Sequence, residues 1–262
     1  MLKGLLQNPR LLIALGIAIF SVISYYGKQS VNPVTGEVQH IDISPEQEIA
    51  LGLQSAPQMA AQHGGLHPDP KMQALVKNVG NKLWKNTEAV QSPYQFDFHL
   101  LADPEVVNAF ALPGGQVFIT YALLSRLENE DQLAGVLGHE IGHVIGRHSA
   151  EHIAQQGLTS GLLNAVVVGA GDVSTAQMAQ TIGQLVNMKY GRADELESDR
   201  FGVKYMIETG YDPNQMIGVM RILEQSSGGS RVPEFQSTHP SPENRVEEIK
   251  RAIADFSGKQ PK

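Results

Sequence analysis

The sequence predicts an α+β fold in which a small sheet lies beside several helices within one domain. Residues 94–100 (YQFDFHL) alternate polar and apolar side chains, which is the pattern of a half-buried strand. Residues 108–120 (NAFALPGGQVFIT) hold two apolar runs separated by Pro-Gly-Gly, which predicts a strand, a turn and a second strand. Around them, apolar residues recur at helical spacing. We therefore expect an antiparallel or mixed sheet covered by helices.

Helix starts are marked by capping residues. Ser44-Pro45, with Gln47 at the capping-box position, and Asp69-Pro70 predict two helices before the sheet. Asp212-Pro213 and Ser241-Pro242 predict two more after it. Further helices are expected over 121–127, 130–156, 174–190 and 192–209, with a loop or loosely held helix over 157–173 and a loop over 226–240.

The composition limits what the chain can bind. Its formal net charge is −7 over 262 residues, which argues against a nucleic-acid-binding protein because such proteins need a basic face. The chain has no cysteine, so disulfides, thiolate metal sites and a cysteine nucleophile are excluded. A metal would have to be bound by histidines and carboxylates. A hydrophobic share of 42% is ample for a core.

The N-terminal segment predicts that the chain is targeted to a membrane. Residues 11–26 form an uncharged apolar run behind Lys3 and Arg10, as in a signal sequence. The best cleavage site, Val22-Ile23-Ser24, matches the small-x-small rule poorly, so an uncleaved signal anchor is favoured over a cleaved signal peptide. The basic residues predict that the N-terminus is cytoplasmic and the rest lies outside.

These patterns predict the organisation of the whole chain. We expect residues 1–26 to be the signal anchor or signal peptide and residues 27–43 to be a linker. The folded domain is expected over residues 44–256, followed by a disordered tail over 257–262.

The sequence GHEIGH (138–143) carries the clearest chemical signal. His139 and His143 are four residues apart, so on a helix both imidazoles can reach one cation. Glu140 projects beside them toward a bound water, and zinc suits imidazole and carboxylate ligands with an open position. The alternative is a polar stripe on an exposed helix. The apolar flanks in LAGVLGHEIGHVIG predict instead a buried helix, where unpaired histidines would be costly, and its glycines predict close backbone packing.

The segment GRADELESDRFG (191–202) offers a third ligand. Glu195 and Asp199 are again four residues apart, so one carboxylate can bind a metal while the other holds a ligating histidine. Glu197 points to the opposite side and is expected to be solvated. Acidic runs on helices are usually exposed faces, but the upstream H-E-x-x-H motif favours the ligand interpretation.

Three segments, GHEIGHVIGRHSAEH, YGRADELESDRFG and STHPSPENRVEEIK, resemble the gluzincin metallopeptidases that include the CAAX prenyl endopeptidase, HtpX and periplasmic BepA-type proteases. The resemblance covers about residues 40–255 and implies a zincin-like domain with one zinc per chain. It implies zinc ligands His139, His143 and Glu195, with Glu140 as general base and Asp199 as the partner of a ligand. The chain most resembles the short, single-domain periplasmic branch. No tetratricopeptide domain is expected to follow, and prenylated substrates are not implied.

Residues 108–111 fit a role in substrate binding. Asn108, Ala109, Phe110 and Ala111 are expected at a sheet edge beside the metal, where an extended polypeptide could pair by strand addition. An ordinary core strand is the alternative.

Other histidines and an arginine have weaker signals. His239 in THPSP has three possible interpretations. It stabilises the oxyanion, or it binds zinc and keeps the enzyme latent, as in some relatives. The third interpretation is a solvated loop histidine without a role in the site. Arg245 is an oxyanion or structural candidate. His148 and His152 form another pair, but His148 lies about 140° around the helix from His143, so both are interpreted as surface residues.

The expected function is a zinc endopeptidase that hydrolyses unfolded or misassembled cell-envelope proteins, with polypeptides bound in extended form. Glu140 would take a proton from the zinc-activated water and return it to the leaving amine. The domain is expected in the bacterial periplasm, anchored to the inner membrane by residues 11–26. One alternative is a non-catalytic zinc-binding chaperone or adaptor, which would not need Glu140. The other is an anchored structural domain, in which case the presence of Glu195 and Asp199 at this spacing would be a coincidence.

Overall fold

The computed structural model describes residues 8–170, 190–226, 235, 238–239 and 244–258. The chain divides into two compact units. The first contains the described parts of 1–32, 36–43 and 150–189, and the second contains 33–35, 44–149 and the described residues from 190 onward. This division differs from the expected domain boundaries because residues 150–170 fall in the same unit as the N-terminal helix.

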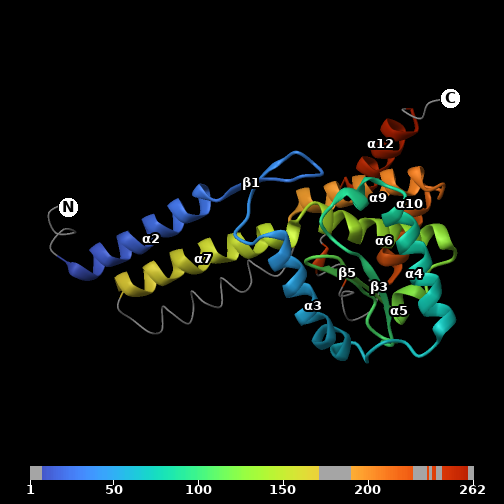
Figure 1. Cartoon of the computed structure of the whole chain (residues 1–262), viewed down its shortest axis with the longest axis horizontal. Coiled ribbons are helices and arrows are strands. Elements are labelled where there is room, and N and C mark those ends of the chain that lie inside the picture. Colours follow the sequence, from blue (N-terminus) through green and yellow to red (C-terminus); the bar gives the residue numbers. More distant parts are fainter. Residues whose placement is uncertain (1–7, 171–189, 227–234, 236–237, 240–243, 259–262) are drawn as a thin grey trace. The chain divides into compact units, whose positions relative to one another are not determined.

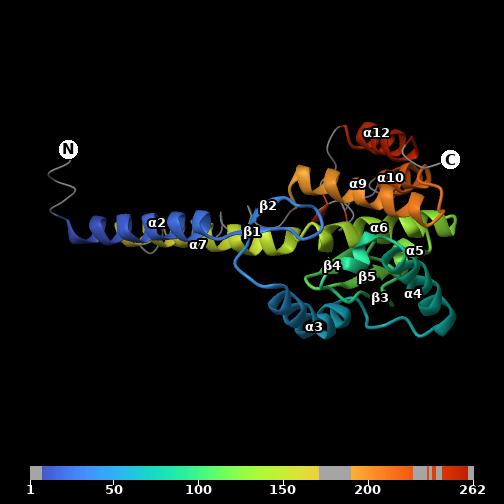
Figure 2. The same cartoon turned by 45° about the horizontal axis from the view of Figure 1, so that its top comes forward.

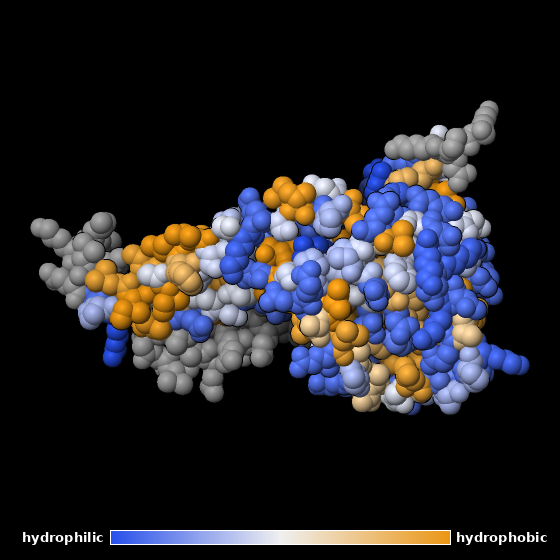
Figure 3. All heavy atoms as spheres, in the orientation of Figure 1, coloured by the Kyte–Doolittle hydropathy of each residue, from blue (hydrophilic) through white to orange (hydrophobic). Residues whose placement is uncertain are grey.

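The first unit holds helix α2 (Pro9–Gly27) and most of α7 (His148–Ala170). Asn8 caps α2 by accepting a hydrogen bond from the backbone N–H of Arg10, and Pro9 fits the first turn. None of the residues Pro9–Gly27 is buried, and hydrophobic residues make up most of the face of this helix that Figure 3 shows. The helix is long and apolar enough to cross a membrane, a property that a signal sequence shares.

One feature of the first unit differs from the expectations. Residues 27–43 contain the antiparallel strands β1 (Gln29–Val31) and β2 (Val38–His40) rather than linker alone. Residues 157–170 are helical as part of α7, which agrees with the helical alternative of the prediction for 157–173. Gly161 lets this helix approach α2 closely, since a Cβ there would lie 2.1 Å from Ser21 Oγ.

The second unit is built from a three-stranded sheet and helices (Figure 1). The strands lie in the order β3 (Asp97–Leu101), β5 (Gln116–Thr120) and β4 (Ala109–Leu112). Strand β3 is parallel and β4 is antiparallel to β5, so the sheet is mixed and β4 forms an edge. The α+β prediction is confirmed. The elements are α3 (Pro45–Gln62), α4 (Pro70–Lys85), the 3-10 helix η1 (Glu88–Gln91), β3 (Asp97–Leu101), β4 (Ala109–Leu112), β5 (Gln116–Thr120), α5 (Tyr121–Leu124), α6 (Glu130–Ile145), the start of α7, α9 (Arg192–Glu208), α10 (Gln215–Ser226) and α12 (Arg245–Ser257).

Capping explains several of these boundaries. Ser44 and Gln47 exchange the hydrogen bonds of a capping box, and Asp69 accepts from the N–H of Lys71. Residues 174–189 of the expected helix over 174–190, the Ser241-Pro242 start and residues 259–262 of the expected tail lie outside the described residues. Helix α12 continues to Ser257, one residue into that tail.

Helix α6 is the central helix of the second unit, lying between the sheet and α9 (Figure 2). Its apolar residues join the core, which includes Phe98 and Leu100 of β3. A Cβ at Gly138 would lie 3.1 Å from Gly202 Cα, and one at Gly142 would lie 2.9 Å from Ser198 Cα. The glycines therefore permit the close backbone packing that the sequence predicted, and this contact brings α9 to the H-E-x-x-H motif.

The expected helix over 130–156 is interrupted. Helix α6 ends at Ile145, and Arg147 has a left-handed backbone with φ 59°. The buried Arg147 guanidinium donates to the Glu48 carboxylate on α3, and the Tyr94 hydroxyl donates to the same carboxylate at 3.0 Å. These contacts hold the chain in the turn that starts α7.

Gly142→Ala is expected to destabilise the protein by about 1–3 kcal/mol, because the added methyl overlaps the backbone of Ser198. The thermal midpoint followed by circular dichroism measures the effect. Gly157→Ala in α7 is the control, since its nearest neighbour would be 3.9 Å away and alanine favours helix, so its midpoint should hold or rise. A Gly142→Ala protein as stable as wild type would contradict the tight α6–α9 contact.

Candidate metal centre

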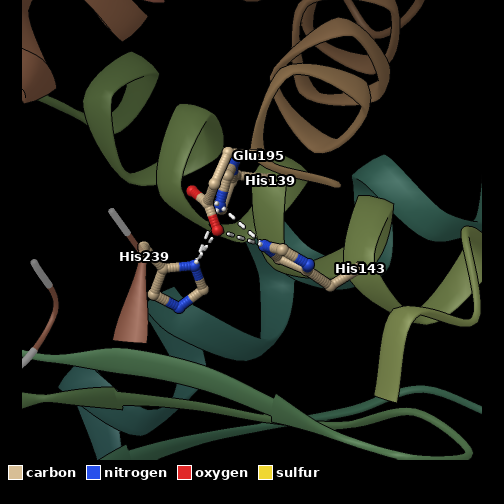
Figure 4. Close-up of side chains that lie close together, drawn as sticks. All are labelled: His139, His143, Glu195 and His239. Atoms are coloured by element: carbon tan, nitrogen blue, oxygen red, sulfur yellow. Dashed lines mark hydrogen bonds and ion pairs between the residues drawn. The ribbon is translucent and has the colours of Figure 1, made fainter. Parts of the chain in front are cut away.

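Four buried side chains converge between α6 and α9. His139, His143, Glu195 and His239 each offer one ligand atom, and these atoms all lie within 4.8 Å of one another. The Nε2 atoms of His139 and His143 are 3.0 Å apart, and each lies 3.5 Å from an oxygen of Glu195. Figure 4 shows the Glu195 carboxylate facing all three imidazole rings. The structure thus brings together the two predicted histidines, the predicted carboxylate and His239.

The chemistry of this group fits a metal cation. Each of the four side chains is at most 2% exposed, so water does not solvate them. Both oxygens of Glu140 and Nε2 of His239 have no hydrogen-bond partner among the described residues. Buried polar atoms without partners are costly, and a cation at the centre of imidazoles and a carboxylate would offset that cost.

The electrostatics favour the ligand forms of two residues. Burial holds the pKa of His143 well below its usual value, so the imidazole is neutral and keeps a lone pair. Burial would raise the pKa of Glu195, but the hydrogen bond with His239 and the charges of His239 and His139 lower it below its usual value. A neutral imidazole and an ionised carboxylate are the forms that bind metals.

Asp199 and Arg245 contact two of the ligand candidates, His139 and Glu195. Nδ1 of His139 lies 2.9 Å from Asp199 Oδ1, as expected for a carboxylate that orients a metal-binding histidine. Arg245 donates to both Asp199 oxygens, at 2.7 and 2.9 Å, and its Nη1 lies 3.2 Å from Glu195. Burial opposes ionisation, but Arg245 and His139 lower the pKa of Asp199. These contacts favour the structural interpretation of Arg245 over the oxyanion one.

Glu140 lies beside the four ligand candidates without joining them. Its carboxylate is fully buried and 3.8 Å from His239 Nε2. Burial raises its pKa, although the charges of His239 and His139 oppose the rise. A buried carboxyl with a raised pKa is suited to accept and return a proton.

The interpretation of His148 as a surface residue was wrong. His148 is 1% exposed, and its Nδ1 lies 2.9 Å from Nδ1 of His143. The angle of 140° assumed one continuous helix, whereas the left-handed Arg147 turns the chain back toward α6. Glu197, expected to be solvated, lies 2.9 Å from His148 Nε2. His152 is partly exposed.

Sequence reasoning also missed Tyr190. Its ring stacks on His143 with centroids 4.1 Å apart, and its hydroxyl is 3.1 Å from Ser149 Oγ. The residue directly precedes the segment that supplies Glu195, but nothing in the local pattern placed its ring on His143.

Three of the four residues predicted to bind substrate lie in an edge strand of the sheet. Ala109, Phe110 and Ala111 belong to the edge strand β4, which contacts α6. Asn108 directly precedes the strand, and its N–H donates to Thr120 Oγ1 at 3.1 Å. Their role in substrate binding stays a prediction.

Comparison with known proteins identifies the family. The family model described as peptidase family M48 matches residues 70–253, which include every residue of the centre. The chain is 32% identical over 232 residues, 85% of its length and 47% of the relative's, to the beta-barrel assembly-enhancing protease of Yersinia pestis. The Escherichia coli K12 protein of that name is 31% identical over 189 residues, covering 68% and 38%.

A mitochondrial relative is similar over almost the whole chain. Metalloendopeptidase OMA1 of Bos taurus is 28% identical over 277 aligned residues, covering 96% of this chain and 51% of its own. The chain spans about half or less of the length of these relatives. The family resemblance inferred from three short motifs is confirmed. With a buried His, His and Glu cluster on an α+β framework and a family match over most of its length, the chain belongs to peptidase family M48.

Proposed function

We propose that the chain is a zinc endopeptidase that hydrolyses unfolded or misassembled proteins of the cell envelope. The observation that carries the proposal is the convergence of His139, His143 and Glu195 beside the buried Glu140. The family supports the peptidase class. A metal-binding chaperone on the same fold would not need a buried carboxylate beside the ligands.

His139, His143 and Glu195 would hold one zinc ion per chain. Nitrogen and carboxylate ligands with a fourth position available to water or to a further side chain are typical of catalytic zinc. The Nδ1 atom of His139 is engaged by Asp199, which leaves Nε2 for the metal.

Glu140 is the proposed general base. Zinc, when bound, supplies a water of lowered pKa and a positive charge near the scissile carbonyl oxygen. Glu140 accepts a proton as the water attacks and returns it to the leaving amine. Its desolvated carboxylate has no competing hydrogen bond among the described residues, so its oxygens are available for the transfer.

The edge strand β4 is the proposed support for the substrate. Residues 108–111 lead from Asn108 into a strand that pairs on one side with β5. An extended polypeptide could add to its other side by main-chain hydrogen bonds, which read little sequence and suit unfolded substrates.

Residues 11–26 are the proposed anchor to the inner membrane, with the catalytic domain in the periplasm. The exposed apolar surface of α2 supports this placement, as does Arg10 at its start. The Yersinia pestis and Escherichia coli relatives bear the name beta-barrel assembly-enhancing protease, which suits a role in envelope quality control.

Metal dependence tests the proposed function. The full-length chain, purified in detergent without added metal, should contain zinc and cleave unfolded casein. A chelator should abolish cleavage, and added zinc should restore it. Protein that binds zinc and unfolded casein without cutting it would support the chaperone instead, and folded protein that takes up no zinc would contradict the site.

His239→Ala is expected to raise basal cleavage. Nδ1 of His239 lies 3.0 Å from Glu195, and His239 is one of the four residues whose ligand atoms converge, so His239 can fill the fourth position and exclude the water. Initial rates on casein at saturating zinc measure the effect. An oxyanion role predicts a loss of roughly 10²-fold or more instead. Unchanged activity would dismiss both roles.

A further inference from the structure

We propose that His148 and Glu197 are positioning residues that select the tautomer of His143 needed to bind a metal. Nδ1 of His143 lies 2.9 Å from Nδ1 of His148, and Nε2 of His148 lies 2.9 Å from Glu197 Oε2. The two contacts connect a proposed ligand through a buried imidazole to a carboxylate on α9. The inference rests on the metal site of the proposed function.

The protons along these contacts have one arrangement that suits a metal ligand. An ionised carboxylate only accepts, so His148 donates to Glu197 from Nε2. A neutral imidazole has one donor and one acceptor, so Nδ1 of His148 accepts and Nδ1 of His143 donates. Nε2 of His143 is then left with its lone pair, and this atom faces Glu195. Glu197 therefore determines, through His148, which nitrogen of His143 can bind the cation.

The local backbone is built to bring His148 to this place. A Cβ at Gly146 would lie 2.4 Å from Nε2 of His148, so only glycine leaves room for the ring to fold back over the end of α6. Arg147 turns the chain with φ 59°. Ser198 Oγ lies 3.4 Å from His148 Nδ1, and Tyr190 stacks on the His143 ring.

The two proposed histidine ligands are thus held by different groups. Asp199 contacts Nδ1 of His139 directly at 2.9 Å. Among the residues that the structure describes, no carboxylate contacts Nδ1 of His143 directly, and His148 connects this atom to Glu197. The partner of a metal-bound histidine fixes its orientation and tautomer, and its loss typically lowers metal affinity or activity by about 10- to 100-fold. We expect an effect of this size for His148.

The first experiment measures zinc affinity of the full-length chain in detergent by competition with a chromophoric chelator. His148→Ala is expected to bind zinc about 10- to 100-fold more weakly than wild type. His148→Asn should keep most of the affinity, because the amide oxygen lies near the position of Nδ1 and can accept from His143. Glu197→Gln should weaken binding, because an amide can donate as well as accept and no longer fixes the proton of His148.

Two controls separate positioning from general stability. Glu208→Gln neutralises another glutamate of the same helix, and it should leave zinc affinity unchanged. In the His148→Asn background, Glu197→Gln should have no further effect, because the connection between Glu197 and His143 is already broken. If Glu197→Gln lowers zinc affinity equally with histidine and with asparagine at position 148, Glu197 acts on stability alone. This result would overturn the inference.

The second experiment reads the tautomer directly. Heteronuclear NMR of histidine ring nitrogens in the metal-free chain should show His143 protonated at Nδ1, and Glu197→Gln should yield a mixture of tautomers. This readout decides the matter if His148→Ala fails to fold. A wild-type chain that takes up no zinc would contradict the proposed function itself. A zinc-binding wild type whose affinity and tautomer are unaffected by the folded His148 and Glu197 variants would overturn this inference alone.

Discussion

Glu140→Gln is expected to lower the rate of casein cleavage by about 10²- to 10⁴-fold, the usual contribution of a general base, while zinc content and fold are retained. Glutamine has the shape of glutamate but cannot accept and return the proton. The side chain is not among the four converging ligand atoms, so the metal site should be intact. Initial rates and zinc content, measured on the same preparations, check both halves of the expectation. Cleavage at the wild-type rate would rule out Glu140 as the base.

The stability of the metal-free Glu140→Gln variant relative to wild type is expected to depend on pH. Burial raises the pKa of Glu140 above its ordinary value. The stabilising contribution of such a carboxyl is fully present below its unfolded-state pKa and is lost as pH rises through the folded-state pKa. Glu140→Gln should therefore gain stability relative to wild type as pH rises from the acid range toward neutrality. Thermal midpoints of the variant and of wild type, measured across that pH range, give the sign of the difference in stability.

Arg245→Met is expected to lower the free energy of unfolding by about 3–5 kcal/mol. The guanidinium is 2% exposed and contacts the buried carboxylates of Asp199 and Glu195. Its removal leaves two buried negative charges without their counter-charge, whereas methionine fills similar space. Chemical denaturation of the metal-free chain measures the loss. The free energy of unfolding of Arg245→Lys should lie between those of wild type and Arg245→Met. An ammonium keeps the charge but not the bidentate contact with Asp199.

A matched control lies on the same two helices. Arg200 on α9 and Asp255 on α12 form an ion pair at 3.0 Å, but both side chains are about half exposed. Solvent screens such pairs, so Arg200→Met should cost at most about 1 kcal/mol. If Arg245→Met and Arg200→Met lower the free energy of unfolding by the same small amount, the buried network does not stabilise the contact between these helices.

Local patterns were sufficient to predict much of this protein. Ser44 with Gln47 marked a helix start because a capping box satisfies backbone groups within a few residues. The strand, turn and strand of residues 108–120 followed from alternation and from the turn-forming glycines. His139 with His143, and Glu195 with Asp199, could be placed on shared faces because helical spacing depends on the backbone alone.

Tertiary structure decided what those patterns could not. His148 was misplaced because a helical wheel assumes a continuous helix, whereas the chain reverses at Arg147, which contacts Glu48 on a distant helix. The approach of His239 and Arg245 depends on how α12 and the residues before it meet α9. The sequence by itself determined the family and which residue types could bind a metal, since both depend on short-range spacing. The tertiary structure alone decided that His148 contacts His143 and that Arg245 contacts Asp199 and Glu195, because these contacts depend on a chain reversal and on residues far apart in the chain.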